Sequence, residues 1–265
     1  MKTIEELLAN YVSKGLTINQ AENCVCQEII LNKIAKSPMA DSVLIKGGVV
    51  MFNITNNLRR VTTDLDFDFI RYDISNESIK LFFNLLNKYD QNCIVSIDKL
   101  EPLHQEDYQG KRVWTIISDK TTKIKFKLDI GVHTLLAIEQ DSICFSFDGE
   151  RKVVLKVNPP EQMFSEKFYS LAKHGPLSFR YKDIFDMYYF IDKKLLNKTK
   201  VKQCLELLIL NKINGINTLE DICENVSLTF EDKQFIENLK TTKEKWLDIS
   251  YDVMLKKILD FIFSL

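Results

Sequence analysis

The periodicity of the apolar residues changes at Pro159–Pro160, and this change constrains the fold more than any other feature of the sequence. Between residues 93 and 157, apolar and polar residues alternate with period two in several runs, which is typical of β-strands. After the proline pair, apolar residues recur every three or four positions, which is typical of amphipathic helices. We therefore predict an α+β N-terminal domain over residues 1–157 and a helical C-terminal domain over residues 158–265.

Further runs complete the expected order of elements. Helical spacing predicts two helices between Ile4 and Lys36, and another helix over residues 78–89. Between them, VLIK and LDFDFI are expected to be strands, joined by a Gly-Gly turn and a helix that ends near Asn56. Later strands are expected at residues 93–97, 111–117, 122–132, 142–147 and 151–157. In the C-terminal domain, helices are expected at residues 161–173, 179–191, 201–210, 230–239 and 245–265.

Charge and cysteine content limit the classes of protein to which the chain can belong. The net charge is -1, so any contact with nucleic acid has to come from a local basic patch. The six cysteines fit neither a disulfide framework nor a paired zinc motif, and the N-terminus does not resemble a secretory signal. No apolar run approaches the roughly 20 residues needed to cross a bilayer. We expect a cytoplasmic protein that does not enter the membrane.

The sequence DLDFDF carries three acids with period two. In a strand, Asp64, Asp66 and Asp68 would project from one face while Leu65 and the phenylalanines face the core. Carboxylates this close repel one another unless water screens them or a cation lies between them, and Mg²⁺ prefers such oxygen ligands. On these residues alone, a solvated strand face and a metal site are both open.

Two nearby features favour a ligand site. Gly47 and Gly48 follow Lys46 at the start of the helix, where backbone N–H groups favour phosphate. This would put a phosphate site and a metal site at the two ends of one strand-helix-strand unit. Asp129 lies in the strand over residues 122–132 and shares a face with three lysines (Lys123, Lys125 and Lys127). If this strand neighbours the acidic one, Asp129 would complete a cluster of three carboxylates.

Several motifs occur in a fixed order along residues 44–191. They are KGG at 46–48, R-x-T-x-DLDFDF at 60–69, KLDIG at 127–131, EKFYSLAK at 166–173 and FRYKDIFDMYYFI at 179–191. Together they resemble the AbiEii/AbiGii-type nucleotidyltransferase toxins of the DNA polymerase β-like superfamily. The resemblance implies a nucleotidyltransferase-like mixed sheet with flanking helices, and transfer of a nucleotidyl group from an NTP.

The resemblance also implies roles for individual residues. Asp64, Asp66 and Asp129 would hold two Mg²⁺ ions, and Asp129 would help to activate the acceptor hydroxyl. Nucleotide contacts are expected from Lys46, Gly47, Gly48, Arg60, Thr62, Lys167, Arg180 and Asp183. Lys167 counts with the three acids as catalytic, because it or Arg180 would neutralise phosphate charge. Arg60 and Thr62 would contact phosphate or brace the turn, and Asp68 is expected outside the core pattern, near the ligands or in solvent.

The acceptor and the wider role stay open at the level of sequence. The resembling family implies RNA as the acceptor, notably the 3′ end of tRNA, and a toxin of an abortive-infection system controlled by a cognate antitoxin. One alternative is a nucleotidyltransferase that modifies a small molecule or a protein side chain. Another is a catalytically silent binding module, although such a module has no physical reason to keep mutually repelling acids.

Overall fold

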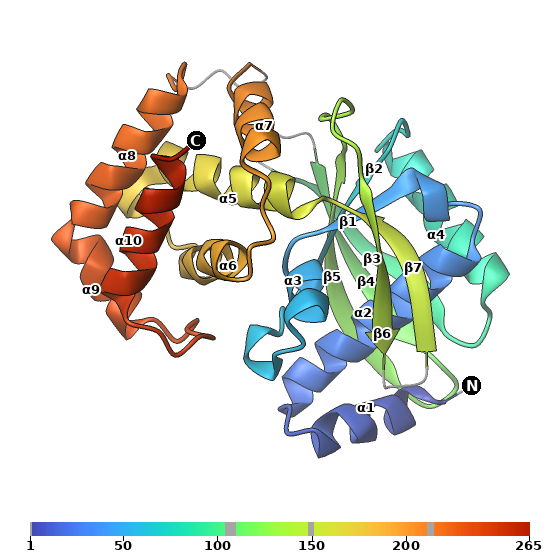
Figure 1. Cartoon of the computed structure of the whole chain (residues 1–265). Helices are drawn as coiled ribbons and strands as arrows, with labels where there is room; N and C mark the ends of the chain where they lie inside the picture. Colours follow the sequence, from blue (N-terminus) through green and yellow to red (C-terminus); the bar gives the residue numbers. More distant parts are fainter. Residues whose placement is uncertain (1, 104–109, 148–150, 211–214) are drawn as a thin grey trace. The chain divides into compact units, whose positions relative to one another are not determined.

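A computed structural model of the chain describes residues 2–103, 110–147, 151–210 and 215–265. The chain divides into two compact units, Met1–Asn158 and Pro159–Leu265, and each is considered by itself. Figure 1 shows that the first unit holds the sheet and that the second consists of helices. No helix in the described ranges combines the length and the apolarity needed to cross a bilayer.

The first unit begins with the two expected helices, α1 (Ile4–Ser13) and α2 (Ile18–Lys36). Thr3 and Thr17 start them with capping boxes, and the backbone turns extended at Ser37, before Pro38. After the short strand β1 (Val43–Lys46), helix α3 (Gly48–Thr55) ends at Asn56. Asn56 adopts the left-handed conformation expected of a terminator, with φ of 47°.

The strands form one mixed sheet in the part of the chain that the structure describes, with the order β3-β4-β5-β2-β1-β7-β6. Its remaining members are β2 (Leu65–Phe69), β3 (Ile94–Pro102), β4 (Gly110–Ser118), β5 (Lys123–Val132), β6 (Asp141–Phe147) and β7 (Arg151–Val157). Neighbouring strands run antiparallel except for β1 with β7 and β2 with β5, which are parallel. The mixed sheet with flanking helices is thereby confirmed.

Period-two alternation determines which face of the sheet is buried. Phe67 and Phe69 of β2 pack against Phe82 of helix α4 (Asn76–Tyr89), with ring centroids 5.7 and 5.0 Å apart. On β5, Ile124 and the apolar residues that alternate with it are buried, whereas Lys123 and Lys125 are exposed. The acids and lysines therefore share the other face, as the alternation predicts.

The second unit contains helices α5 (Pro160–His174), α6 (Tyr181–Asp192), α7 (Lys198–Leu210), α8 (Leu219–Glu231), α9 (Lys233–Thr241) and α10 (Tyr251–Ile262). Helix α5 packs against α6, α7 and α8, and α10 packs against α6 and α8. Aromatic contacts contribute to this core, including Tyr189 with Trp246 at 5.5 Å. Two predicted boundaries are wrong. The helix expected over residues 230–239 is interrupted at Asp232, and the last helix begins at Tyr251 instead of Lys245.

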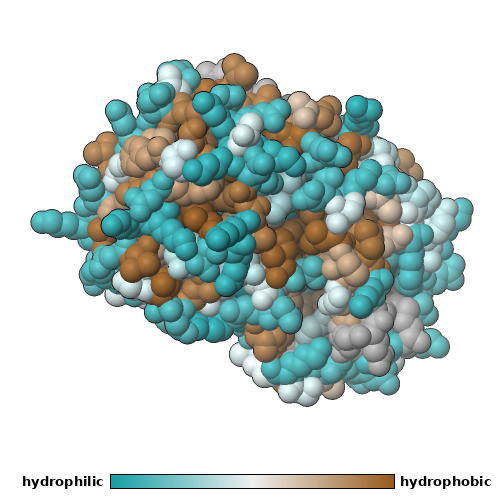
Figure 2. Space-filling model, in the orientation of Figure 1, coloured by the Kyte–Doolittle hydropathy of each residue, from teal (hydrophilic) through white to brown (hydrophobic). Residues whose placement is uncertain are grey.

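Hydrophobic side chains also reach the surface. Figure 2 shows them in patches among hydrophilic residues on the face that is drawn. Leu177 and Phe179, which lie shortly before α6, are about four-fifths exposed (80% and 79%). More than half of an ordinary protein surface comes from apolar atoms, so exposed side chains of this kind do not by themselves define a binding surface.

Candidate active site

The acids predicted as metal ligands meet on two adjacent strands. Strand β2 pairs with β5 in parallel, and Asp66 is the direct partner of Asp129 in this pairing. Neighbouring strands lie about 4.8 Å apart, so these two residues are as close as strand geometry allows. Asp64 directly precedes β2, two residues before Asp66. The two strands are neighbours, which was the condition for a cluster of three carboxylates, and the pairing brings the three acids to one region of the sheet.

The Gly-Gly turn lies beside the same acids. Strand β1 runs antiparallel to β2 with Lys46 opposite Asp66, so the turn that follows Lys46 reaches the start of β2. Gly47 has φ of 71° and ψ of -145°, a conformation that is essentially restricted to glycine. A Cβ atom at Gly47 would overlap Oδ2 of Asp66. The two predicted sites were expected at the two ends of the strand-helix-strand unit, but the antiparallel return of β2 brings Asp66 beside the Gly-Gly turn.

Thr62 connects the turn to the acids. A Cβ atom at Gly48 would lie 2.5 Å from Oγ1 of Thr62, so glycine is needed there for close approach. The same hydroxyl donates a hydrogen bond to Oδ1 of Asp64 at 2.9 Å. The N-terminus of α3 follows Gly47, which has no side chain to cap it, so the first N–H groups of the helix start beside the acids. Thr62 thus braces both the turn and a predicted metal ligand.

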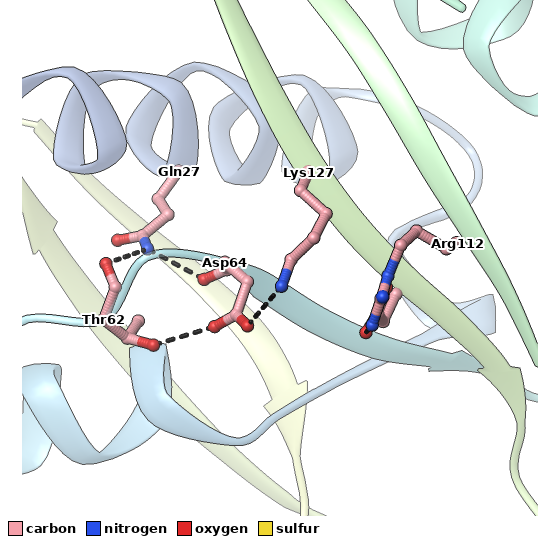
Figure 3. A network of polar contacts seen from close by, with 6 residues as sticks. Gln27, Thr62, Asp64, Arg112 and Lys127 are labelled. Carbon is pink, nitrogen blue, oxygen red and sulfur yellow. Dashed lines mark hydrogen bonds and ion pairs between the residues drawn. The ribbon is translucent and has the colours of Figure 1, made fainter. Parts of the chain in front are cut away.

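Gln27 holds the loop before β2 in place. No pattern in the sequence predicts that Gln27 belongs to the site. It lies on α2 and is 2% exposed. Its Nε2 atom donates to the backbone carbonyls of Thr62 at 3.2 Å and Asp64 at 2.9 Å, as Figure 3 shows. These are two carbonyls of one irregular segment, so a single amide group sets the path of the backbone that presents Asp64.

Two basic side chains contact the predicted metal ligands, and Figure 3 shows the first of these contacts, from Lys127 to Asp64. Lys127 Nζ lies 3.1 Å from Oδ2 of Asp64. Arg112, on β4, forms a bidentate pair with Asp129, from Nε to Oδ1 at 2.9 Å and from the terminal amine to Oδ2 at 2.8 Å. The hydrogen bonds to Asp129 raise the pKa of Arg112 above its ordinary value. In this arrangement the mutual repulsion of the acids is offset by these two cations of the protein itself.

The residues can be tested for their fit to magnesium. Within the described ranges, no three acidic, histidine or cysteine side chains converge as a ready metal site. The donors are nevertheless of the right kind, since Mg²⁺ takes carboxylate oxygens, and Asp66 and Asp129 are direct neighbours. The set fits a divalent cation once the contacts of Lys127 and Arg112 are exchanged for contacts with the ion.

Three residues near the predicted ligands are held within the protein. Lys46, predicted to contact nucleotide, forms an ion pair with Asp68 at 2.7 Å. Of the two settings expected for Asp68, solvent is wrong, because Asp68 is 5% exposed and the antiparallel return of β2 places it within reach of Lys46; a position near the ligands stays a prediction. Arg60 closes a short 3-10 helix (Leu58–Arg60) and is 3% exposed.

The later motifs form a cluster within the second unit. Lys167 of α5 contacts the carboxylates of Asp183 and Asp186 on α6, the latter at 3.0 Å. Arg180 Nε donates to the other oxygen of Asp183 at 2.6 Å. Asp186 is fully buried and was not singled out from the sequence, although its spacing of three residues places it on the same helix face as Asp183. The structure thus brings Lys167, Arg180 and Asp183 together.

Electrostatics keep this cluster charged. Burial alone would raise the pKa of Asp183, but Lys167 and Arg180 lower that pKa to well below its ordinary value. Lys167 is buried between two carboxylates, whereas the Arg180 side chain is 61% exposed. Arg180 can therefore reach a ligand directly, and Lys167 is placed first of all to hold α5 and α6 together. Whether these groups act with Asp64, Asp66 and Asp129 stays a prediction.

A sequence model of one family matches residues 29–260, and the family is described as "Nucleotidyl transferase AbiEii toxin, Type IV TA system". The chain belongs to the AbiEii family. It is therefore a nucleotidyltransferase of a toxin family that belongs to type IV toxin-antitoxin systems. The match spans both units and includes every residue predicted for the site.

Two solved structures show a distant likeness. They are JHP933 from Helicobacter pylori and a protein named "putative nucleotidyltransferase" from H. pylori, each with 11% identity and a TM-score of 0.46. The likeness covers 94% of this chain in both cases, and 92% and 95% of the respective H. pylori chains. At these values neither likeness adds to the family assignment. No curated protein matches the chain.

Proposed function

We propose that the chain catalyses Mg²⁺-dependent transfer of a nucleotidyl group from an NTP to RNA, such as the 3′ end of tRNA, and thereby acts as a toxin. One observation carries the chemistry. Asp66 and Asp129 are direct partners on parallel strands, and the Gly47 turn contacts Asp66 from the other side. Carboxylates beside a glycine turn and a helix N-terminus suit a metal-bound triphosphate.

The chain's own residues take distinct roles in this proposal. Asp64, Asp66 and Asp129 would hold two Mg²⁺ ions, which when bound would stabilise the charge on the attacking and leaving oxygens. Asp129 would also help to orient and deprotonate the acceptor hydroxyl. Thr62 and Gln27 keep Asp64 and its loop in place, so the position of the ligands is fixed before substrate arrives.

Nucleotide binding would use the turn and exposed cations. The backbone N–H groups of Gly47 and Gly48 are suited to phosphate oxygens because no side chain intervenes. Among the predicted contacts, Arg180 is the exposed cation, and Asp183 would orient it. The burial of Arg60 and the pairing of Lys46 with Asp68 favour bracing roles for both.

RNA is the acceptor we favour, on two grounds. The family is one of toxins, and an acceptor present in every cell would make transfer harmful. On β5, the exposed Lys123 and Lys125 continue the face that carries Asp129, which offers phosphate contacts next to the acids. Type IV membership implies a cognate antitoxin encoded with the toxin. The cytoplasmic location expected from sequence accords with such a substrate and stays part of the proposal.

Transfer of label from each NTP in turn tests the proposal. The protein is incubated with Mg²⁺ and labelled NTP, with tRNA, total RNA or no acceptor, beside Asp66→Asn. Asp98→Asn is the matched control, because Asp98 is another acid of the sheet, 44% exposed and 3.5 Å from Lys125. We expect Asp98→Asn to retain transfer to tRNA and Asp66→Asn to lose at least about a hundredfold. Label in the protein or in a small molecule would support the alternative acceptors, and no Asp66-dependent label under any condition would refute the proposal.

A further inference from the structure

Every oxygen of Asp64 and Asp129 already has a donor within the chain. Asp64 accepts from the Thr62 hydroxyl at Oδ1 and contacts Lys127 at Oδ2, and both oxygens of Asp129 accept from Arg112. We propose that Lys127 and Arg112 are internal counter-ions that occupy these two carboxylates until the metal-bound nucleotide arrives, and that they then bind its triphosphate. The inference rests on the proposed function, and it concerns two residues that the resemblance does not assign.

The register of the sheet makes these contacts a built feature of the fold. Arg112, Asp129 and Asp66 are consecutive partners across β4, β5 and β2, so they form one row on the sheet. Lys127 precedes Leu128, whose partner is Leu65, so Lys127 lies level with Asp64, two residues along and on the same face of the sheet. The backbone therefore fixes one cation next to each of the two acids.

The side chains can nevertheless move. The side chains of Lys127 and Arg112 are 26% and 36% exposed, and those of Asp64 and Asp129 are 27% and 17% exposed. Solvent screens partly exposed ion pairs, so they stabilise a fold much less than buried pairs do. Contacts with a bound ligand can therefore offset the loss of these ion pairs. Removal of either cation is not expected to unfold the sheet.

The charge of the ligand determines whether it can replace the two ion pairs that are broken. A divalent cation next to Asp64 or Asp129 would be repelled by an ammonium or guanidinium group a few ångströms away. A metal ion that binds without nucleotide therefore has to displace Lys127 and Arg112 from their carboxylates, and it offers these two cations no anionic group in exchange. A triphosphate supplies anionic oxygens for both of them, and guanidinium binds phosphate with the same bidentate geometry that it uses for carboxylate. Metal and nucleotide should therefore bind with positive coupling, which is reciprocal by thermodynamic necessity.

Binding measurements on the full chain test this exchange without reference to turnover. Mn²⁺ affinity is measured by electron paramagnetic resonance in the absence of nucleotide, for the wild type, Lys127→Gln and Arg112→Gln. Lys125→Gln is the matched control, because Lys125 lies two residues away on the same strand and face but contacts Asp98 instead. Each site variant should bind Mn²⁺ about fivefold more tightly than the wild type, since a nearby positive charge is gone, and the control should be unchanged.

Nucleotide binding should change in the opposite direction. Equilibrium dialysis with labelled, non-hydrolysable analogues of the four NTPs, at saturating Mn²⁺, should show about tenfold weaker binding by Lys127→Gln and Arg112→Gln, because the phosphates lose charged donors. Tighter metal binding combined with weaker nucleotide binding is a signature that a purely structural ion pair would not give. Mn²⁺ affinity that is unchanged or weakened in both variants would overturn the exchange.

The outcome is separable from that of the proposed function. Asp66→Asn is included in the same metal titration, because it removes a predicted ligand while Lys127 and Arg112 both stay in the chain. If Asp66→Asn loses Mn²⁺ while Lys127→Gln and Arg112→Gln bind it as the wild type does, the metal site stands and the exchange is refuted. If the wild type binds no Mn²⁺ with or without nucleotide, both the exchange and the metal-dependent function are refuted.

Discussion

Replacing Gly47 with alanine tests whether the turn and Asp66 form one site. Two physical effects add at this position. The backbone conformation, with φ of 71° and ψ of -145°, is strained for any residue with a Cβ atom, at a cost of about 1–3 kcal/mol. The new methyl group would also overlap Oδ2 of Asp66, and displacing a packed group costs a further 1–3 kcal/mol or so. We expect Gly47→Ala to destabilise the first unit by about 3 kcal/mol.

Gly15→Ala separates the two effects. Gly15 also has positive φ, at 94°, but a Cβ atom there meets nothing within 4 Å. It should therefore show only the backbone term, about 1 kcal/mol, and leave nucleotide transfer unchanged. Gly47→Ala should in addition reduce transfer at least about a hundredfold, because a small displacement of a catalytic group has that effect.

Hydrogen exchange read out by mass spectrometry suits this comparison, because peptides of the first unit are followed separately from those of the second. Protection of β1 and β2 gives the local free energy of opening, and transfer of labelled nucleotide is measured on the same preparations below the unfolding temperature. If Gly47→Ala matches Gly15→Ala in both protection and transfer, Asp66 does not depend on the turn, and the reasoning is refuted.

Three further predictions concern buried polar groups. Lys167→Met leaves Asp183 and Asp186 buried without their shared cation, so the second unit should lose about 3–5 kcal/mol in urea unfolding; a loss below 1 kcal/mol would contradict this. Because the pKa of Asp183 is lowered in the folded state, its contribution to stability is present above the unfolded pKa and is lost as the pH falls through the folded value. Acid titration of the second unit should therefore show a shallower loss of stability for Asp183→Asn than for the wild type, and equal slopes would argue against the pairing. Gln27→Met removes both hydrogen bonds to the loop that contains Thr62 and Asp64. The local free energy of opening should fall there by about 1–3 kcal/mol, seen as faster hydrogen exchange of the loop, while α2 stays protected.

The sequence was sufficient for elements whose periodicity is local. Alternation in DLDFDF and KIKFKLDIG predicts both strands and the face that carries the acids, and Asn56 ends α3 as its preference for the left-handed conformation indicates. Apolar spacing was less reliable in the second unit. It continues through Asp232, but the carboxylate of Asp232 accepts a hydrogen bond from the Phe235 N–H at 2.7 Å and starts a new helix there.

Contacts between distant segments lay beyond local patterns. The sequence allowed β5 to neighbour β2 but could not fix the register that pairs Asp66 with Asp129, since more than sixty residues separate them. For the same reason, Lys127 and Arg112 gave no sign that they would contact the predicted ligands. Gln27 lies in a helix that is buried over most of its length, so neither periodicity nor charge distinguishes it. Such residues are found only when the sheet order is known.

Anomalous diffraction from crystals grown with Mn²⁺ and a non-hydrolysable NTP analogue tests the central claim most directly. The account predicts manganese density between β2 and β5, with carboxylate oxygens of Asp66 and Asp129 as direct ligands, and phosphate oxygens against the Gly47 turn. The peaks should vanish in Asp66→Asn crystals. Manganese and triphosphate bound elsewhere on the chain, away from Asp64, Asp66 and Asp129, would contradict the account.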